Sequence, residues 1–145
     1  MIRQKGFTLL EVLVAVLVLA IGLLGLAGLQ ATSLQVNQSA SMRSQATNLA
    51  YDMADRIRAN RSAARAGDYD SQALATTPPS CAVITLSGTL AARDIAFWRN
   101  ALACTLPLST GSIARTGDTF TITIQWDDTH GQAATPQQFV MMTDL

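Results

Sequence analysis

The N-terminal part of the chain carries one long apolar run with a single acidic residue at its start. No residue from Val12 to Leu29 is charged or polar. As a helix these 18 residues extend about 27 Å, close to the ~30 Å hydrocarbon core of a bilayer. Glu11 precedes the run, and a carboxylate near the bilayer centre costs roughly 2.5–3.5 kcal/mol. The pattern therefore predicts one membrane-spanning helix. It also indicates that the Glu11 carboxylate has a function that offsets its cost in the membrane.

The same helix is predicted to continue well beyond the apolar run. Five apolar residues follow one another in steps of four, three, four and four, which trace one helical face. They are Met42, Ala46, Leu49, Met53 and Ile57. No Gly lies between Gly28 and Gly67, and Gly67 follows an Arg-rich turn that is typical of a helix C-terminus. We expect one helix from about residue 7 to 65.

Shorter elements are predicted in the rest of the chain. Residues 68–80 are typical of a loop, and residues 81–87 of a short strand. Residues 89–105 predict a second helix that ends before Pro107. Its apolar face comprises Ala91, Ile95, Trp98 and Leu102.

Three strands complete the pattern. The clearest lies within residues 118–128, where apolar residues alternate with Thr and Gln. Residues 111–114 and 137–145 predict the other two strands. The expected fold class is α+β: a lollipop in which a long N-terminal helix, membrane-spanning in its first half, packs on a small head with a short helix and a three-stranded antiparallel meander.

The distribution of charges predicts the orientation of the helix across the membrane. The net charge is zero, but Arg3 and Lys5 precede the apolar run, and no acidic residue comes before Glu11. Positive residues beside a spanning helix favour the cytoplasmic side, so the N-terminus is expected inside and the chain after Leu29 outside. The expected segments are a leader (1–6), a membrane or fibre-core half-helix (7–29), an exported amphipathic half-helix (30–66) and a head (67–145).

Two cysteines, Cys81 and Cys104, lie in the part that is expected outside. An oxidising compartment favours a disulfide between them, and two free thiols are the alternative that the sequence leaves open. The loop that a disulfide would close is a little over 20 residues long, for which the chain-entropy model gives ~3 kcal/mol.

The N-terminus differs from an ordinary secretory signal, because the apolar run is too long and no small-residue cleavage site follows it. Gly6 instead separates the basic leader from the apolar run. Cleavage after Gly6 would keep the helix in the mature protein, starting with the amine of Phe7. Glu11 would then lie in the first turn, where the helix dipole favours a carboxylate. It could neutralise the amine of its own chain or of a neighbour.

Residues 6–12, Gly-Phe-Thr-Leu-Leu-Glu-Val, resemble the prepilin cleavage motif of type IV pilins and type II secretion pseudopilins. The resemblance implies that a prepilin peptidase cuts between Gly6 and Phe7 and N-methylates Phe7. It also implies that Glu11 pairs with the N-terminal amine of an adjacent subunit during assembly. A plain signal anchor with an isolated Glu is the alternative.

Longer segments resemble the PilV-type minor pilins, also called type IV pilus modification proteins. They are residues 9–30, 46–64, 97–113 and 120–128. The implied function is that of a minor pilin in a complex that primes the pilus or caps its tip. The implied partners are the prepilin peptidase, other minor pilins, the major pilin and the inner-membrane assembly platform. The implied location is the bacterial inner membrane, crossed once with the head in the periplasm, and then the pilus fibre at the cell surface.

Two other functions remain open. An I-type pseudopilin of type II secretion shares the N-terminal features, and a tip adhesin or DNA-binding minor pilin would use the head. A basic cluster raises the DNA possibility, but Asp52 and Asp55 dilute it and no aromatic residues interleave with it. With zero net charge, nucleic acid is not favoured as a partner. The cluster comprises Arg56, Arg58, Arg61 and Arg65.

No enzymatic chemistry is predicted. His130 near Asp127 and Asp128 raises the idea of a metal or acid–base site, but such residues are ordinary in a Gly-containing loop, and no nucleophile motif accompanies them. Asp68 and Asp70 lack the spacing of an EF-hand. The sequence thus predicts no metal, no cofactor and no catalytic residue.

Aromatic and glycine residues complete the sequence pattern. Trp98 and Trp126 lie on apolar faces and are expected in the core. Gly22, Gly25 and Gly28 recur every three residues in the apolar run. Close helix packing, local softening of the helix and the ordinary composition of spanning helices explain these glycines equally well.

Overall fold

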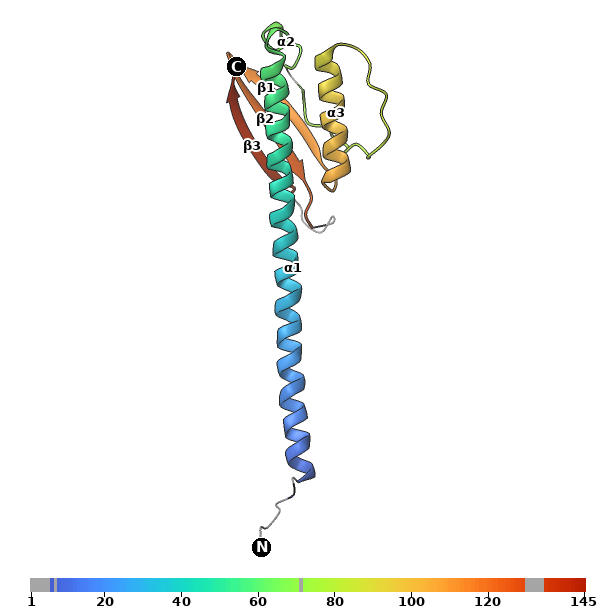
Figure 1. The fold of residues 1–145 in the computed structure, drawn as a ribbon, viewed down its shortest axis with the longest axis vertical. Helices are drawn as coiled ribbons and strands as arrows, with labels where there is room; N and C mark the ends of the chain where they lie inside the picture. Colours follow the sequence, from blue (N-terminus) through green and yellow to red (C-terminus); the bar gives the residue numbers. More distant parts are fainter. Residues whose placement is uncertain (1–5, 7, 71, 130–134) are drawn as a thin grey trace. The chain divides into compact units, whose positions relative to one another are not determined.

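The structure is a computed structural model that describes residues 6, 8–70, 72–129 and 135–145. It divides into two compact units, Met1–Gln38 and Ser39–Leu145. The first helix, α1 (Leu9–Ala59), begins in the N-terminal unit and ends in the C-terminal unit (Figure 1).

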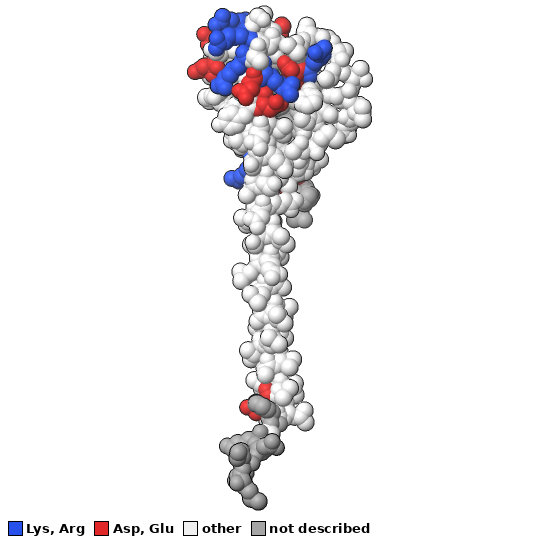
Figure 2. Space-filling model, in the orientation of Figure 1, with Lys and Arg blue, Asp and Glu red and all other residues white. Residues whose placement is uncertain are grey.

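The N-terminal unit exposes the apolar side chains of its helix. Every large apolar side chain from Leu9 to Leu29 is 53–86% exposed. The sequence from Val12 to Gln38 holds no charged residue, and Figure 2 shows this length of α1 almost free of charge. By length and composition, α1 is the one helix in the described part of the chain that can cross a membrane. An apolar surface of this extent is suited to lipid or to other apolar helices.

The C-terminal unit adds two helices and one sheet to the end of α1. The helices are α2 (Arg61–Ala66) and α3 (Leu90–Thr105), and the strands are β1 (Thr110–Thr116), β2 (Thr119–Trp126) and β3 (Gln137–Asp144). The strands form an antiparallel sheet in the order β1-β2-β3 (Figure 1). The predicted α+β fold, with its long N-terminal helix, short helix and three-stranded meander, is confirmed.

The core lies between α1, α3 and one face of the sheet. The alternation of β2 is confirmed, because its four apolar residues are at most 2% exposed. They are Phe120, Ile122, Ile124 and Trp126. The predicted face of α3 is buried, and the indole nitrogen of Trp98 donates a hydrogen bond to the backbone oxygen of Leu49, 2.9 Å away. This bond fixes α3 to α1.

The buried face of α1 agrees with the helical spacing except at one position. Met42, Ala46, Met53 and Ile57 are buried, whereas Leu49 is only partly buried at the margin of the core. Two small residues, Ala50 and Ala54, are fully buried beside them. They extend the buried face of α1 between the larger side chains.

The expected single helix to residue 65 is wrong at its end. α1 ends at Ala59, and α2 begins at Arg61. Asn60 between them has φ −106° and ψ 51°, and its side-chain amide donates to the hydroxyl of Tyr69 at 3.1 Å. Asn has a low helix propensity, so this tertiary bond is enough to break the helix. The predicted stop at Gly67 is confirmed for α2, since Gly67 has φ 92° and caps it in the left-handed conformation.

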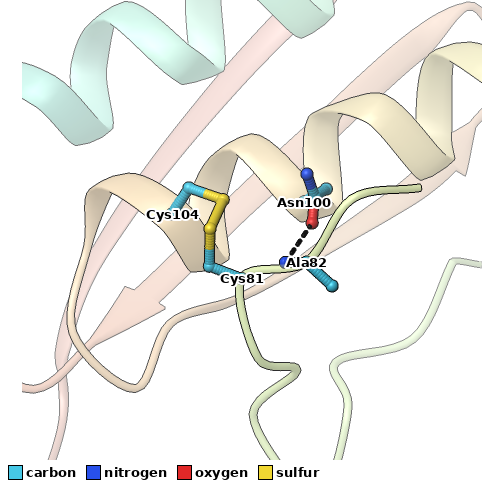
Figure 3. Close-up of a disulfide and its surroundings, with 4 residues drawn as sticks. All are labelled: Cys81, Ala82, Asn100 and Cys104. Atoms are coloured by element: carbon cyan, nitrogen blue, oxygen red, sulfur yellow. Dashed lines mark hydrogen bonds between the residues drawn. A yellow bond between two sulfur atoms is a disulfide. The ribbon is translucent and has the colours of Figure 1, made fainter.

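The expected strand at residues 81–87 is also wrong, because this segment has no regular structure. The backbone nitrogen of Ala82 donates to the side-chain oxygen of Asn100 at 3.2 Å (Figure 3). Val83 is fully exposed. A side chain of α3 thus takes the place of a neighbouring strand. The apolar composition of this segment indicated a strand, but most of its residues are exposed rather than buried.

Candidate processing and assembly site

The start of α1 is capped by Thr8. The backbone nitrogen of Glu11 donates to the side-chain oxygen of Thr8 at 3.3 Å and to its backbone oxygen at 3.1 Å. Thr8 is therefore the N-cap and Glu11 the third helical residue, in the Thr-x-x-Glu spacing of a capping box. The sequence reasoning missed this function of Thr8, although the spacing is a recognised signal. The cap fixes Glu11 in the first turn, at the positive end of the helix dipole.

The Glu11 side chain is exposed at this position. Among the described residues it makes no ion pair and no side-chain hydrogen bond. A shallow apolar groove runs from it along the helix, because Ala15 is small between larger neighbours. The groove is lined by Val12, Val16 and Leu19. An unneutralised carboxylate beside an apolar groove is suited to a cationic group carried by an apolar segment.

Gly6, before the cap, is exposed, and a side chain added there would meet no atom within 4 Å. Gly6 is therefore accessible to a second protein. Phe7, the expected N-methylation position, lies outside the described residues.

The structure joins Cys81 to Cys104 in a disulfide (Figure 3). Cys104 lies in the last turn of α3, and Cys81 lies in the irregular segment before that helix. The bond between Ala82 and Asn100 lies one turn along α3. Together these links attach the segment to the helix.

The basic cluster of the sequence does not remain together as a free positive surface. Arg56 pairs with Asp52 at 2.9 Å and with Asp94 at 3.1 Å, and its guanidinium lies 4.7 Å from the centre of the Phe97 ring. The hydrogen bond to Asp52, followed by that to Asp94, raises the pKa of Arg56. Arg56 therefore serves to connect α1 with α3.

The remaining arginines of the cluster differ from one another. Arg58 pairs with Asp55 at 3.4 Å and donates to the hydroxyl of Thr143 in β3. Arg61 and Arg65 are exposed and have no partner among the described residues. Figure 2 shows basic and acidic side chains mixed at this end of the C-terminal unit. Two exposed arginines among acidic groups give no continuous basic path for a nucleic-acid backbone.

Asp94 is a buried carboxylate that the sequence reasoning missed. It is 8% exposed and accepts a hydrogen bond from the hydroxyl of Tyr69 at 2.6 Å, in addition to its pairing with Arg56. Burial, followed by the bond to Asp94, raises the pKa of Tyr69 to about 12. Because Tyr69 also accepts from Asn60, one polar network joins α1, the segment after α2 and α3. The network is structural, since each polar group meets a protein partner.

Arg115 in β1 holds the C-terminus of α2 with its guanidinium. Its guanidinium donates to the backbone oxygens of Ala64 at 2.8 Å and Arg65 at 3.3 Å. It also pairs with Asp70 at 3.6 Å. Carbonyl oxygens at the C-terminus of a helix lie at the negative end of its dipole, so a cation there is favourable.

The loop after β2 holds the residues considered for metal or acid–base chemistry. Asp127 accepts from the backbone and the hydroxyl of Thr129, and Asp128 accepts from the hydroxyl of Ser39 at 3.0 Å. His130 lies outside the described residues. The two aspartates thus have structural partners, in a turn and in a link to α1. Trp98 and Trp126 lie in the core, as expected.

A capped apolar helix that continues into a small α+β unit defines a pilin-like protein. A family model described as the prokaryotic N-terminal methylation motif matches residues 1–27, and a model described as type IV pilin Tt1218 matches residues 28–96. Comparisons with curated proteins and with solved structures give no significant match. The chain is a type IV pilin-like protein, and the pilin class to which it is similar is structural rather than enzymatic.

Proposed function

We propose that this chain is a minor pilin subunit of the type IV pilus. A prepilin peptidase cleaves it between Gly6 and Phe7 and methylates the new amine, which removes the leader (1–6). Residues 7–29 then hold the subunit in the inner membrane and later enter the fibre core. Residues 30–66 and the head (67–145) are exported. The match to the methylation motif over residues 1–27 supports this division at its N-terminal end.

The observation that carries the proposal is the position of the Glu11 carboxylate and its lack of a partner among the described residues. Its carboxylate lies in the first turn of an apolar helix and has no partner among the described residues. An uncompensated charge in an apolar environment is costly, so a cation must reach it during assembly. The N-terminal amine of a neighbouring subunit, created by cleavage, supplies that cation. The subunit therefore enters the fibre when this pair forms.

The partners in this proposal are the prepilin peptidase, other minor pilins, the major pilin and the inner-membrane assembly platform. The chain crosses the inner membrane once, with its N-terminus in the cytoplasm and its head in the periplasm. It acts in the complex that primes the fibre or caps its tip. The basic leader with Arg3 and Lys5 supports this orientation.

The test separates processing from assembly by replacing Glu11. We expect Glu11→Gln and Glu11→Ala to be cleaved after Gly6, because neither change touches the cleaved bond, and to lose incorporation into pili. Glu11→Asp, which keeps the charge, is the matched control and should retain part of the incorporation. Mass spectrometry of the mature N-terminus reads processing, and quantification in sheared pili reads assembly. Normal incorporation of Glu11→Ala would contradict the assembly function of Glu11.

A deletion strain decides between a function in the pilus and a function in a type II secretion system. Deletion of the chain should reduce piliation and leave protein secretion unchanged. A secretion defect with normal pili would instead place the chain among the pseudopilins.

A further inference from the structure

The two outer edges of the sheet are treated differently by the fold. At the β1 edge, the backbone of Ile113 exchanges two hydrogen bonds with Gln72, at 2.9 and 2.8 Å. The backbone nitrogen of Ala75 also donates to the Thr110 hydroxyl at 2.9 Å. The chain therefore covers the edge of β1 with its own segment. Among the described residues, no such segment pairs with the outer edge of β3 (Figure 1).

The register shows which backbone groups are left at the edge of β3. The nitrogen of Leu145 donates to the oxygen of Asp118, so these two residues form a hydrogen-bonded pair. In an antiparallel ladder such pairs alternate with non-bonded pairs, so the odd residues of β3 bond to β2. The even residues direct both their N–H and C=O groups to the free edge. They are Gln138, Val140, Met142 and Asp144.

The side chains along this edge do not protect it. Val140 is 46% and Met142 is 71% exposed, and both lie on the outer face of the sheet. β3 contains no Lys, Arg or Pro, and its eight residues pair with β2 without a bulge. Natural edge strands usually carry a charged residue, a Pro or a bulge, because an open edge is a template for another strand. An edge that is long, regular, uncharged except at Asp144 and partly apolar is built to be paired.

We propose that the free edge of β3 receives an extended strand from a different pilin subunit, which adds a fourth strand to the sheet. The inference rests on the proposed function, since that function brings other subunits beside this one. The incoming strand supplies four N–H and C=O partners to the even residues of β3. Its side chains beside Val140 and Met142 are uncharged and apolar or β-branched, because a charge there would lose water without gaining a partner.

The direction of β3 argues against a second copy of this chain as the occupant. Arg43 of α1 donates to Gln137 at the start of β3, and Arg58 donates to Thr143 near its end. β3 therefore runs in the same direction as the last part of α1. Two copies joined antiparallel through this edge would have opposed α1 helices, which chains anchored by the same end in one membrane cannot adopt. Parallel pairing of two copies is the less stable arrangement.

The first experiment measures backbone amide exchange in the full-length protein, residue by residue. In the detergent-solubilised subunit, we expect slow exchange at Phe139, Met141 and Thr143 and fast exchange at Val140 and Met142. In sheared pili or the extracted minor-pilin complex, Val140 and Met142 should become about as slow as their odd neighbours. Fast exchange at both residues in the assembled protein would overturn the inference.

The second experiment removes one outward N–H group. Val140→Pro is compatible with an edge position, because the N–H of Val140 does not bond to β2. Val140→Thr keeps the N–H group and the β-branched shape and is the matched control. We expect at least about a tenfold loss of bound pilin subunits in extracted complexes for Val140→Pro, equivalent to about 1.4 kcal/mol, and little loss for Val140→Thr. Retained tryptophan fluorescence would show that the Val140→Pro head is folded.

The outcomes separate this inference from the proposed function. A chain that is processed after Gly6 and present in pili, but whose Val140→Pro variant binds its neighbours normally, would overturn the strand addition alone. A chain that is neither processed nor present in pili would overturn the proposed function. A cross-link between two copies through residues engineered at Met142 would overturn the choice of a different subunit.

Discussion

The hydroxyl of Tyr69 donates a hydrogen bond of 2.6 Å to Asp94, which is itself paired with Arg56 at 3.1 Å. This relationship brings together α1, α3 and the segment after α2 through residues that are 25 and 38 positions apart. A carboxylate that is 8% exposed is tolerated only because it has a cation and a hydroxyl donor. The position of α3 on α1 therefore depends on these polar contacts as well as on the core.

Replacement of Asp94 by Ala should destabilise the C-terminal unit by about 2–4 kcal/mol, since it leaves Tyr69 without an acceptor and Arg56 with Asp52 alone. Urea unfolding of the full chain in detergent, followed by tryptophan fluorescence, measures the change, because both tryptophans lie in the core. Asp55→Ala is the control, since the Asp55 side chain is 74% exposed in its pair with Arg58 and its loss should cost less than about 1 kcal/mol. Equal losses of unfolding free energy in the two variants would contradict the conclusion that the buried contacts of Asp94 stabilise the unit.

The stability of the C-terminal unit should fall at high pH through Tyr69. Burial and the bond to Asp94 raise the pKa of Tyr69 from 10.0 to about 12 in the folded state. Between these values the folded state keeps a proton that the unfolded state has lost, so the free energy of unfolding decreases as pH rises. The stabilisation is complete below pH 10.0 and is lost by about pH 12.

Tyr69→Phe isolates this effect. The variant is expected to be less stable at neutral pH, because Asp94 loses a donor, and to show a smaller decrease in stability over the same pH range. The difference in tyrosinate absorbance between the wild type and Tyr69→Phe reads the titration of Tyr69 directly. Titration of this Tyr69 signal near the ordinary pKa of a tyrosine would contradict the assignment.

The elements that the sequence predicted correctly are those in which one periodicity dominates. β2 alternates over its whole length, and the buried faces of α1 and α3 recur every three or four residues, so burial follows from local spacing. The disulfide could also be expected, because only Cys81 and Cys104 are available. In the N-terminal unit, the Thr-x-x-Glu spacing was present in the sequence and was overlooked.

The features that sequence reasoning missed depend on contacts between distant residues. Asp94 resembles an exposed helix residue, and its burial follows only from the positions of Arg56 and Tyr69. The break at Asn60 likewise requires Tyr69 to be nearby. Residues 81–87 have a strand-like composition, but Asn100 and the disulfide hold them outside the sheet. No local pattern encodes such contacts.

Substitution of Gly111 by Ala should destabilise the C-terminal unit by about 1–3 kcal/mol through overpacking. A methyl group at this position of β1 would lie 2.6 Å from Leu102 Cδ1 and 2.8 Å from Trp98 Cζ3, and it would also clash with Trp98 Cη2, so α3 must move away from the sheet. Ser112→Ala, on the opposite face of the same strand, is the control and should change stability much less. Thermal unfolding of the full chain in detergent compares the two. Unchanged stability of Gly111→Ala would show that α3 can shift without loss.

Loss of the disulfide should cost about 3 kcal/mol, because the bond closes a loop of 23 residues in sequence separation. The Cys81→Ser, Cys104→Ser double variant should unfold at lower urea concentration than the wild type, and dithiothreitol should have the same effect on the wild type but none on the variant. The irregular segment should then become the first site of limited proteolysis, since Ala82 retains only its bond to Asn100. If cleavage begins instead within β1 or β2, the disulfide supports the whole sheet, and the segment before α3 is held mainly by Asn100.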